Sequence, residues 1–210
     1  MINHHPDGDI LLSYAAGALG ESWSIAIASH LAFCDECRRS VELLEDLGGH
    51  MLDTSSLNPV PEFHGDLPLD IVNFGSGSKA NVKLNKDLPT PLNEYVVAED
   101  ISSINWRYIG GGVHEHVIET ADDGCARLLK IPGGRVVPEH GHHGRELTLV
   151  LQGSFGDHNG EFFAGDVADI SDGVVHKPVA NAGTDCICLA VTDAPLKFSG
   201  IIPNLVQRLF

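Results

Sequence analysis

The sequence predicts an α + β chain of two domains: a small helical domain held together by zinc, followed by a small domain of β-strands. Three observations lead to this prediction. Apolar residues recur at helical spacing over roughly the first fifty residues. Histidine and cysteine residues at metal-ligand spacing lie within this helical pattern. From residue 93 onward, short apolar runs alternate with turn signals. We therefore divide the chain into a zinc-binding helical domain at 1–60, a linker at 61–92, a strand domain at 93–195 and a tail at 196–210.

Composition limits the classes of partner. The chain has 210 residues and a formal net charge of -16, which argues against a nucleic-acid-binding surface and is compatible with a basic protein partner. It contains neither an apolar run long enough to span a bilayer nor a basic segment followed by an apolar one at the N-terminus. The five cysteines are unevenly spaced, which favours metal ligands or free thiols in a reducing cytoplasm. We expect a cytoplasmic protein without membrane contacts.

Three short helices are predicted in the first segment. The first covers Asp9–Leu19, where the apolar stripe ends before a glycine. The second is expected to begin at Ser22, which can act as its N-cap. The third begins near Cys37 and is expected to stop at Gly48 and Gly49. A domain of about fifty residues buries little apolar surface. It therefore usually needs a metal or a disulfide to stabilise it.

A pattern of metal ligands supplies that stabilisation. His30 and Cys34 are four residues apart and therefore lie on one face of a helix, and Cys37 follows at the spacing of a zinc knuckle. Three ligands leave one position open. His5 is the best candidate for the fourth ligand, with His4 as a weaker alternative. Two cysteines and two histidines would form a closed, structural zinc site.

Residues 51–92 are predicted to form mainly a linker. Pro59, Pro61, Pro68 and the Gly-Ser-Gly-Ser run at 75–78 argue against a long helix. At most a short turn of helix is expected at Leu67–Phe74.

Strands follow from residue 93. Asn159-Gly160 is a hairpin turn signal. Cys186 and Cys188 are two residues apart on a late strand and so share a face; apolar packing is the favoured interpretation, with a redox role as the alternative. Cys125 has no partner nearby in the sequence. The predicted strands are Ile104–Ile109, Val113–Glu119, Arg127–Ile131, the run after Glu146, Phe155–Asp157, Glu161–Phe163 and Cys186–Val191.

A second metal motif organises this strand domain. Gly134, His140, His142, Glu146 and Gly153 fit the pattern G-x5-H-x-H-x3-E-x6-G at every fixed position. Histidines two residues apart on a strand point to the same face, and a carboxylate on the next strand can converge with them. Two imidazoles and a carboxylate make a mixed site for a divalent transition metal. The pattern is similar to the first motif of the cupin family, whose fold is a β-barrel (a double-stranded β-helix).

The stretch from 165 to 181 resembles the second cupin motif. Gly165, Gly173 and His176 match it, whereas Ser171 and Ala180 stand where proline and asparagine are usual. We expect a metal ion to be bound by His140, His142, Glu146 and His176. This set of ligands accepts Zn, Mn, Fe, Ni or Cu.

Another histidine pair, His114 and His116, has the same H-x-H spacing. No carboxylate follows at cupin spacing, so we interpret both as strand residues on a polar face.

Together the two motifs resemble the ChrR group of anti-sigma factors, in which a zinc anti-sigma domain precedes a cupin domain. The similar stretches include LLSYAAGALGE, SHLAFCDECR, IPGGRVVPEHGH, ELTLVLQG and DCICLAVTDAPLKF. The resemblance implies a structural zinc at His5, His30, Cys34 and Cys37, and a cupin metal at the four ligands named above. It also implies a further helix after the zinc core that packs on the sigma factor, which the prolines of 51–92 disfavour here.

The function implied by this resemblance is that of a transcriptional regulator. The zinc domain would hold an extracytoplasmic-function sigma factor inactive in a 1:1 complex, and the cupin domain would release it when singlet oxygen is present. A cupin-type metal-dependent dioxygenase is the alternative, and a small-molecule-binding cupin with a zinc dimerisation module is a third hypothesis. Nothing in the sequence marks an acid-base pair beyond the ligands, so we expect a regulator and not an enzyme.

Overall fold

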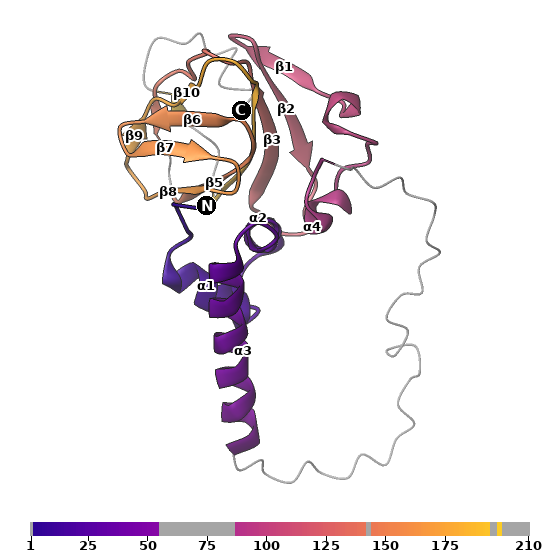
Figure 1. Cartoon of the computed structure of the whole chain (residues 1–210), viewed down its shortest axis with the longest axis vertical. Helices are drawn as coiled ribbons and strands as arrows, with labels where there is room; N and C mark the ends of the chain where they lie inside the picture. Colours follow the sequence, from indigo (N-terminus) through magenta and orange to yellow (C-terminus); the bar gives the residue numbers. More distant parts are fainter. Residues whose placement is uncertain (1, 55–86, 142–143, 194–196, 199–210) are drawn as a thin grey trace.

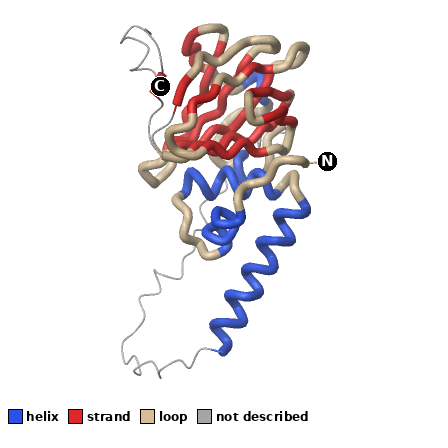
Figure 2. The backbone as a smooth tube through the Cα atoms, turned by 90° about the vertical axis from the view of Figure 1, so that its left-hand side faces the viewer, coloured by secondary structure: helices blue, strands red, loops and turns tan. Residues whose placement is uncertain are grey.

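The N-terminal part is helical and the remainder is rich in strands, as predicted. The computed structural model describes residues 2–54, 87–141, 144–193 and 197–198. Three helices, α1 (Gly8–Ala15), α2 (Glu21–Leu31) and α3 (Asp35–Thr54), lie on one side of the strand domain (Figures 1 and 2). A short helix α4 (Thr90–Asn93) and a 3-10 turn η2 (Ile101–Ser103) lead into the strands. The short helix predicted at Leu67–Phe74, and most of the tail, lie outside the described residues.

The helix boundaries correct three predictions. Helix α1 ends at Ala15, four residues early, because the chain turns at Gly17 with a φ of 66°. Helix α2 has Gly20 as its N-cap, and Ser22 lies buried inside it, donating a hydrogen bond to Asp122. Helix α3 continues through the two glycines to Thr54. A helical glycine costs only about 1 kcal/mol relative to alanine, so it does not end a helix unless the backbone turns left-handed there.

Within the described residues, the strands form three antiparallel sheets. The turn between β6 and β7 confirms the predicted hairpin, with Asp157 opposite Gly160. Strand β1 begins at Arg107, later than predicted, because Ile104 is the C-cap of η2 and the amide of Trp106 donates to the Ile104 carbonyl, so pairing with β2 starts only at Arg107. The six-stranded sheet has the order β1 (Arg107–Gly110), β2 (Val113–Ile118), β3 (Cys125–Ile131), β11 (Cys186–Thr192), β5 (Glu146–Gln152) and β8 (Val167–Ile170). The smaller sheets have the orders β10 (Val179–Ala180), β6 (Ser154–Asp157), β7 (Gly160–Phe163) and β12 (Lys197–Phe198), β4 (His140–Gly141), β9 (Val175–His176).

Both faces of the large sheet are covered at its central strands, β11 and β5. One face packs, with the smaller sheets, around an interior cluster that includes Val150, Phe155 and Cys188. On the other face, Leu147 and Leu189 belong to a single apolar cluster that also contains residues of α2, among them Ala26 and Ile27. The alternation of side chains along β5 explains why its first six residues are all buried. The helical part and the barrel therefore share one apolar core.

Polar contacts reinforce this junction at two places. Oδ1 of the buried Asp166 accepts hydrogen bonds from the backbone amides of Asn3 and His4, and the amide of Val167 donates to the carbonyl of His4. The N-terminal segment is thus bound along the turn between β7 and β8. At the second place, Arg145 forms ion pairs across the junction with Asp7 and Asp9, and Asp169 of β8 holds the same guanidinium on the barrel side.

Two candidate metal sites

The first candidate site lies where the N-terminal segment, α2 and α3 meet. One ligand atom from each of its four residues lies within 4.8 Å of the others; the residues are His5, His30, Cys34 and Cys37. Nδ1 of His5 is 3.4 Å from Sγ of Cys34 and 3.2 Å from Sγ of Cys37. Because α2 ends at Leu31, the cysteines fall in the tight connection to α3 and in its first turn. The ring of His4, the weaker alternative, instead packs against Phe162.

The chemistry of this first cluster fits a zinc ion. Nδ1 of His30 lies 2.9 Å from the carbonyl oxygen of Gly165 and therefore donates to it, which leaves a lone pair on Nε2. That Nε2 is buried and has no hydrogen-bond partner among the described residues. Burial lowers the pKa of His30 to about 4, so the ring stays neutral. A buried lone pair beside two thiols is the environment that a structural zinc satisfies.

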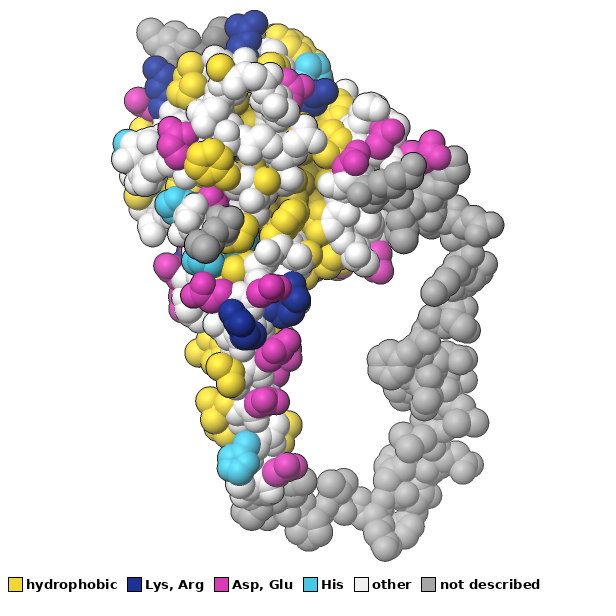
Figure 3. Space-filling model, in the orientation of Figure 1, with side chains coloured by type: hydrophobic (Ala, Val, Ile, Leu, Met, Phe, Trp, Pro, Cys, Tyr) yellow, Lys and Arg dark blue, Asp and Glu magenta, His cyan; other side chains and the backbone are white. Residues whose placement is uncertain are grey.

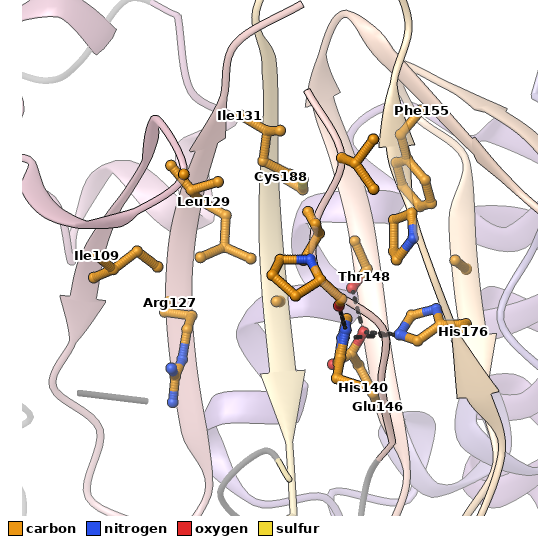
Figure 4. Close-up of a pocket in the computed structure, with 18 of the residues that line it drawn as sticks. Ile109, Arg127, Leu129, Ile131, His140, Glu146, Thr148, Phe155, His176 and Cys188 are labelled. Carbon is orange, nitrogen blue, oxygen red and sulfur yellow. Dashed lines mark hydrogen bonds and ion pairs between the residues drawn. The ribbon is translucent and has the colours of Figure 1, made fainter. Parts of the chain in front are cut away.

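The second candidate site is inside the barrel. His140 on β4, Glu146 on β5 and His176 on β9 each place a ligand atom within 4.8 Å of the other two, and all three side chains are buried. His140 and His176 face each other because β4 and β9 pair with these two residues opposite. Figure 4 shows the three side chains converging at one end of the pocket. His142, the remaining predicted ligand, lies outside the described residues.

The tautomers of the two histidines favour a cation between them. Nδ1 of His140 donates to the carbonyl of Pro138 at 2.8 Å, and Nδ1 of His176 donates to the Asp157 carboxylate at 3.2 Å. Each Nε2 of a neutral ring then carries a lone pair, and the two Nε2 atoms are 3.0 Å apart. Two lone pairs at this distance repel each other unless a positive charge lies between them. Asp157 and Pro138 are thus outer partners that orient the ligands, as at known metal sites.

Burial dominates the acid-base properties of this second site. It raises the pKa of Glu146 to about 7, and it lowers the pKa of His140 to about 4. The pKa of His176 is also lowered by burial, against the opposing effect of Asp157. The hydroxyl of Thr148 donates to Glu146 at 3.1 Å and partly offsets the burial. Without a metal, the cluster thus favours neutral forms, so a bound cation would replace a proton on Glu146.

A cavity of about 320 Å³ adjoins this cluster. Most of its lining is apolar, and the charged residues on it are Arg127 and Glu146. Arg127 is buried and pairs with Glu115, which is itself fully buried and also pairs with Arg107. The cavity reaches the surface where the half-exposed Val136 lines it.

The other histidines and cysteines have different roles. His114 and His116 lie on β2 and hydrogen-bond backbone carbonyls, in agreement with their predicted strand placement. Cys186 and Cys188 share a face as predicted, with their sulfur atoms 3.9 Å apart. Nη2 of Arg127, two residues further along β3, donates to Sγ of Cys125 at 2.6 Å, a contact that the sequence analysis did not predict.

Sequence reasoning missed the residues that support the ligands. Asp157 precedes the hairpin turn and has no metal-ligand spacing, and Gly165 matches the second cupin motif without any indication that its carbonyl accepts from His30. Arg145 lies between two predicted ligands, but its partners on the helical side, Asp7 and Asp9, are more than a hundred residues away in the sequence.

Comparison with known proteins identifies relatives along the whole chain. The family described as "ChrR Cupin-like domain" matches residues 94–195. The protein named anti-sigma-E factor ChrR from Cereibacter sphaeroides is 42% identical over 212 residues, which cover 100% of this chain and 98% of the relative. The crystal structure of Rhodobacter sphaeroides SigE in complex with the anti-sigma ChrR contains a similar chain, with 40% identity and a TM-score of 0.78. That match covers 92% of this chain and 100% of the other.

Proposed function

This chain belongs to the ChrR family of anti-sigma factors, and on this premise we propose that it binds an extracytoplasmic-function sigma factor in a 1:1 complex and holds it inactive. The family makes the chain a regulator and not an enzyme. In this proposal, the helical part supplies the inhibitory surface. The barrel senses oxidative stress, with singlet oxygen as the signal, and releases the sigma factor in the cytoplasm.

The observation that carries the proposal is the exposed apolar stripe of α3. Leu43, Leu47 and Met51 recur every four residues and are 70%, 55% and 64% exposed. Residues at this spacing lie on one face of a helix. Helix α3 extends away from the barrel (Figure 1), and apolar side chains follow one edge of it (Figure 3). Contiguous exposed apolar faces of this kind are more often found at protein-protein contacts than on the rest of a protein surface.

The net charge supports the same choice of partner. At -16 the chain attracts a basic protein surface, and such attraction speeds association. In this respect a DNA-binding sigma factor, whose own surface must be basic to contact phosphates, is complementary to the chain.

None of the described helices is both long and apolar enough to cross a membrane.

The two proposed metals have different tasks. A zinc ion at His5, His30, Cys34 and Cys37 would hold α2, α3 and the N-terminal segment in the inhibitory arrangement. A divalent transition metal in the barrel would be held by His140, Glu146 and His176 with His142. The hydrogen bond from His30 to Gly165 and the Arg145 ion pairs connect the two parts, so a change at the barrel metal can reach the helices.

The binding test uses the full chain co-expressed with a candidate sigma factor. Leu47→Glu places a charge in the apolar stripe and is expected to weaken the complex by at least about 10-fold, because one charge buried without a partner costs more than 1.4 kcal/mol. Gly49→Glu is the matched control: it adds the same carboxylate about 200° away around α3, where nothing lies within 4 Å of an added Cβ. Failure to form any complex, or equal effects of the two variants, would refute the proposed surface.

The sensing test uses a reporter driven by a sigma-dependent promoter in cells given light and a photosensitiser. The Glu146→Ala chain is expected to repress before exposure and to keep repressing afterwards. If it releases the promoter as the unchanged chain does, the barrel metal is not the sensor.

A further inference from the structure

The cavity beside the barrel cluster has features that the anti-sigma function does not use. Its volume of about 320 Å³ is at the lower end of the roughly 300–1,000 Å³ found for small-molecule sites. It is therefore too small for a folded segment of a partner protein and large enough for a small molecule. Its walls are mainly apolar and include Ile109, Leu129, Ile131, Phe155 and Cys188 (Figure 4).

One cross-strand row sets the polar end of the cavity. On the large sheet, Arg127 of β3 lies opposite Ala190 of β11, which in turn lies opposite Thr148 of β5. All three line the cavity. Neighbouring strands are about 4.8 Å apart, so the guanidinium and the Thr148–Glu146 pair stand on the two sides of a gap roughly 10 Å wide at the backbone. Ala190 leaves the space between them open because its side chain is a single methyl group.

The charges around this gap favour an anion. Glu115 pairs with both Arg127 and Arg107, so these three side chains together carry one net positive charge. A divalent cation at the cluster would outweigh Glu146, the one carboxylate among the described ligands. An anionic oxygen placed above Ala190 would therefore have a guanidinium on one side and a metal cation on the other, in a site shielded from water.

We propose that the barrel binds a small amphiphilic carboxylate, with its apolar chain along the cavity walls and its carboxylate above Ala190 between Arg127 and the bound metal. The inference rests on the metal site of the proposed function, and it adds a ligand to that site. The ligand class follows from three features on this one cavity: size, apolar walls and a single positive end. A medium-length chain of about eight carbons suits the volume.

The test measures binding of octanoate to the full, metal-loaded chain by calorimetry. Octanoate is expected to bind 1:1 and about 200-fold more tightly than butanoate, because it buries four more methylenes and each contributes about 0.8 kcal/mol. It should also bind at least about 10-fold more tightly than 1-octanol, which lacks the charge that Arg127 and the metal attract. Equal binding of octanoate and butanoate, equal binding of octanoate and 1-octanol, or no saturable binding would overturn the proposal. These comparisons use the unchanged chain, so their outcome does not depend on the folding of a variant.

A variant locates the site. Ala190→Leu fills the gap and is expected to weaken octanoate binding by at least about 10-fold, since the carboxylate position is then occupied. Ala182→Leu, on an exposed turn, is the control and should leave binding unchanged. Octanoate binding that survives Ala190→Leu in a folded, metal-loaded protein would overturn the assigned site. Metal content and sigma binding are measured in the same samples, so failure of the unchanged chain to bind octanoate while it retains both would refute this inference and leave the proposed function standing.

Discussion

Nδ1 of His30 donates a hydrogen bond to the carbonyl oxygen of Gly165 over 2.9 Å, so a candidate zinc ligand is oriented by the barrel and not by its own helical neighbours. Gly165 belongs to the same turn that binds Asn3 and His4. This turn therefore positions two of the four candidate ligands, His30 directly and His5 through the segment that precedes it. Zinc affinity should depend on the barrel.

The first prediction tests this turn. Gly165→Ala is expected to weaken zinc binding by about 10-fold or more, because the added Cβ would collide with the tip of the Ile2 side chain and lie 3.2 Å from Cβ of Phe33, so that both neighbours beside the N-terminal segment must shift. Gly173→Ala is the control: both glycines have positive φ, 94° and 76°, but nothing lies near Gly173. Chelator competition on both proteins separates the clash from backbone strain. Equal zinc affinities would contradict the assignment of the turn.

The second prediction concerns the zinc itself. Cys37→Ala should remove the metal and lower the free energy of unfolding by about 4 kcal/mol when free zinc is 1,000 times its dissociation constant. Helical circular dichroism should fall with it, since metal binding contributes folding energy in so small a helical part. Cys125→Ala is the comparison, because Cys125 lies outside both clusters. A Cys37→Ala protein that retains its zinc and its helices would refute the structural-zinc assignment.

The third prediction tests the outer partner of His176. Asp157→Asn removes the charge that accepts the Nδ1 proton and is expected to lower the metal affinity of the barrel by about 10- to 100-fold. The zinc of the helical part should be unaffected. Metal analysis after dialysis against graded chelator concentrations provides the measurement. If both metals are lost together, Asp157 acts on the fold and not on the ligand.

The fourth prediction is a pH dependence of metal binding in the barrel. The pKa of Glu146 is raised to about 7, so below pH 7 the metal must displace a proton. Affinity should rise about 10-fold per pH unit up to pH 7 and then level off. His140, whose pKa is about 4, adds no dependence in this range. Glu146→Gln should abolish the rise; an affinity that is constant between pH 5.5 and 8 in the unchanged chain would contradict the prediction.

The same raised pKa affects the metal-free fold. Because the folded value of about 7 exceeds the ordinary 4.5, ionised Glu146 destabilises the metal-free protein as pH rises from 4.5 to 7. The loss amounts to about 3 kcal/mol at pH 8, at 1.36 kcal/mol per unit of pKa. Metal-free Glu146→Gln should therefore be the more stable protein at pH 8 and gain no such advantage at pH 4.5, as urea unfolding at the two pH values can show.

The sequence was sufficient where one local rule decides the structure. Strand alternation located β2, β3 and β11, the Asn-Gly turn located the β6–β7 hairpin, and ligand spacing singled out the residues that both clusters bring together. It failed where a distant contact decides. Ser22 resembles an N-cap, but its hydroxyl bonds Asp122, a hundred residues away. Likewise, nothing near His30 in the sequence indicates Gly165 as its partner.

The predicted C-terminal end of the third helix was wrong for a different reason. Gly48-Gly49 lowers the stability of a helix without forcing a left-handed turn, so α3 continues to Thr54. The extension includes Met51, which completes the exposed apolar stripe.

The apolar core common to α2 and the large sheet has a consequence for how the chain can be divided. A protease cut anywhere between residues 54 and 87 would sever the covalent connection but leave Ala26, Ile27, Leu147 and Leu189 buried against one another. The nicked protein should then migrate as one particle under native conditions and as two bands only in detergent. Two separately synthesised pieces should likewise reassemble in trans. Inhibition and sensing would thus be recovered from fragments, although neither fragment by itself presents a complete folded surface.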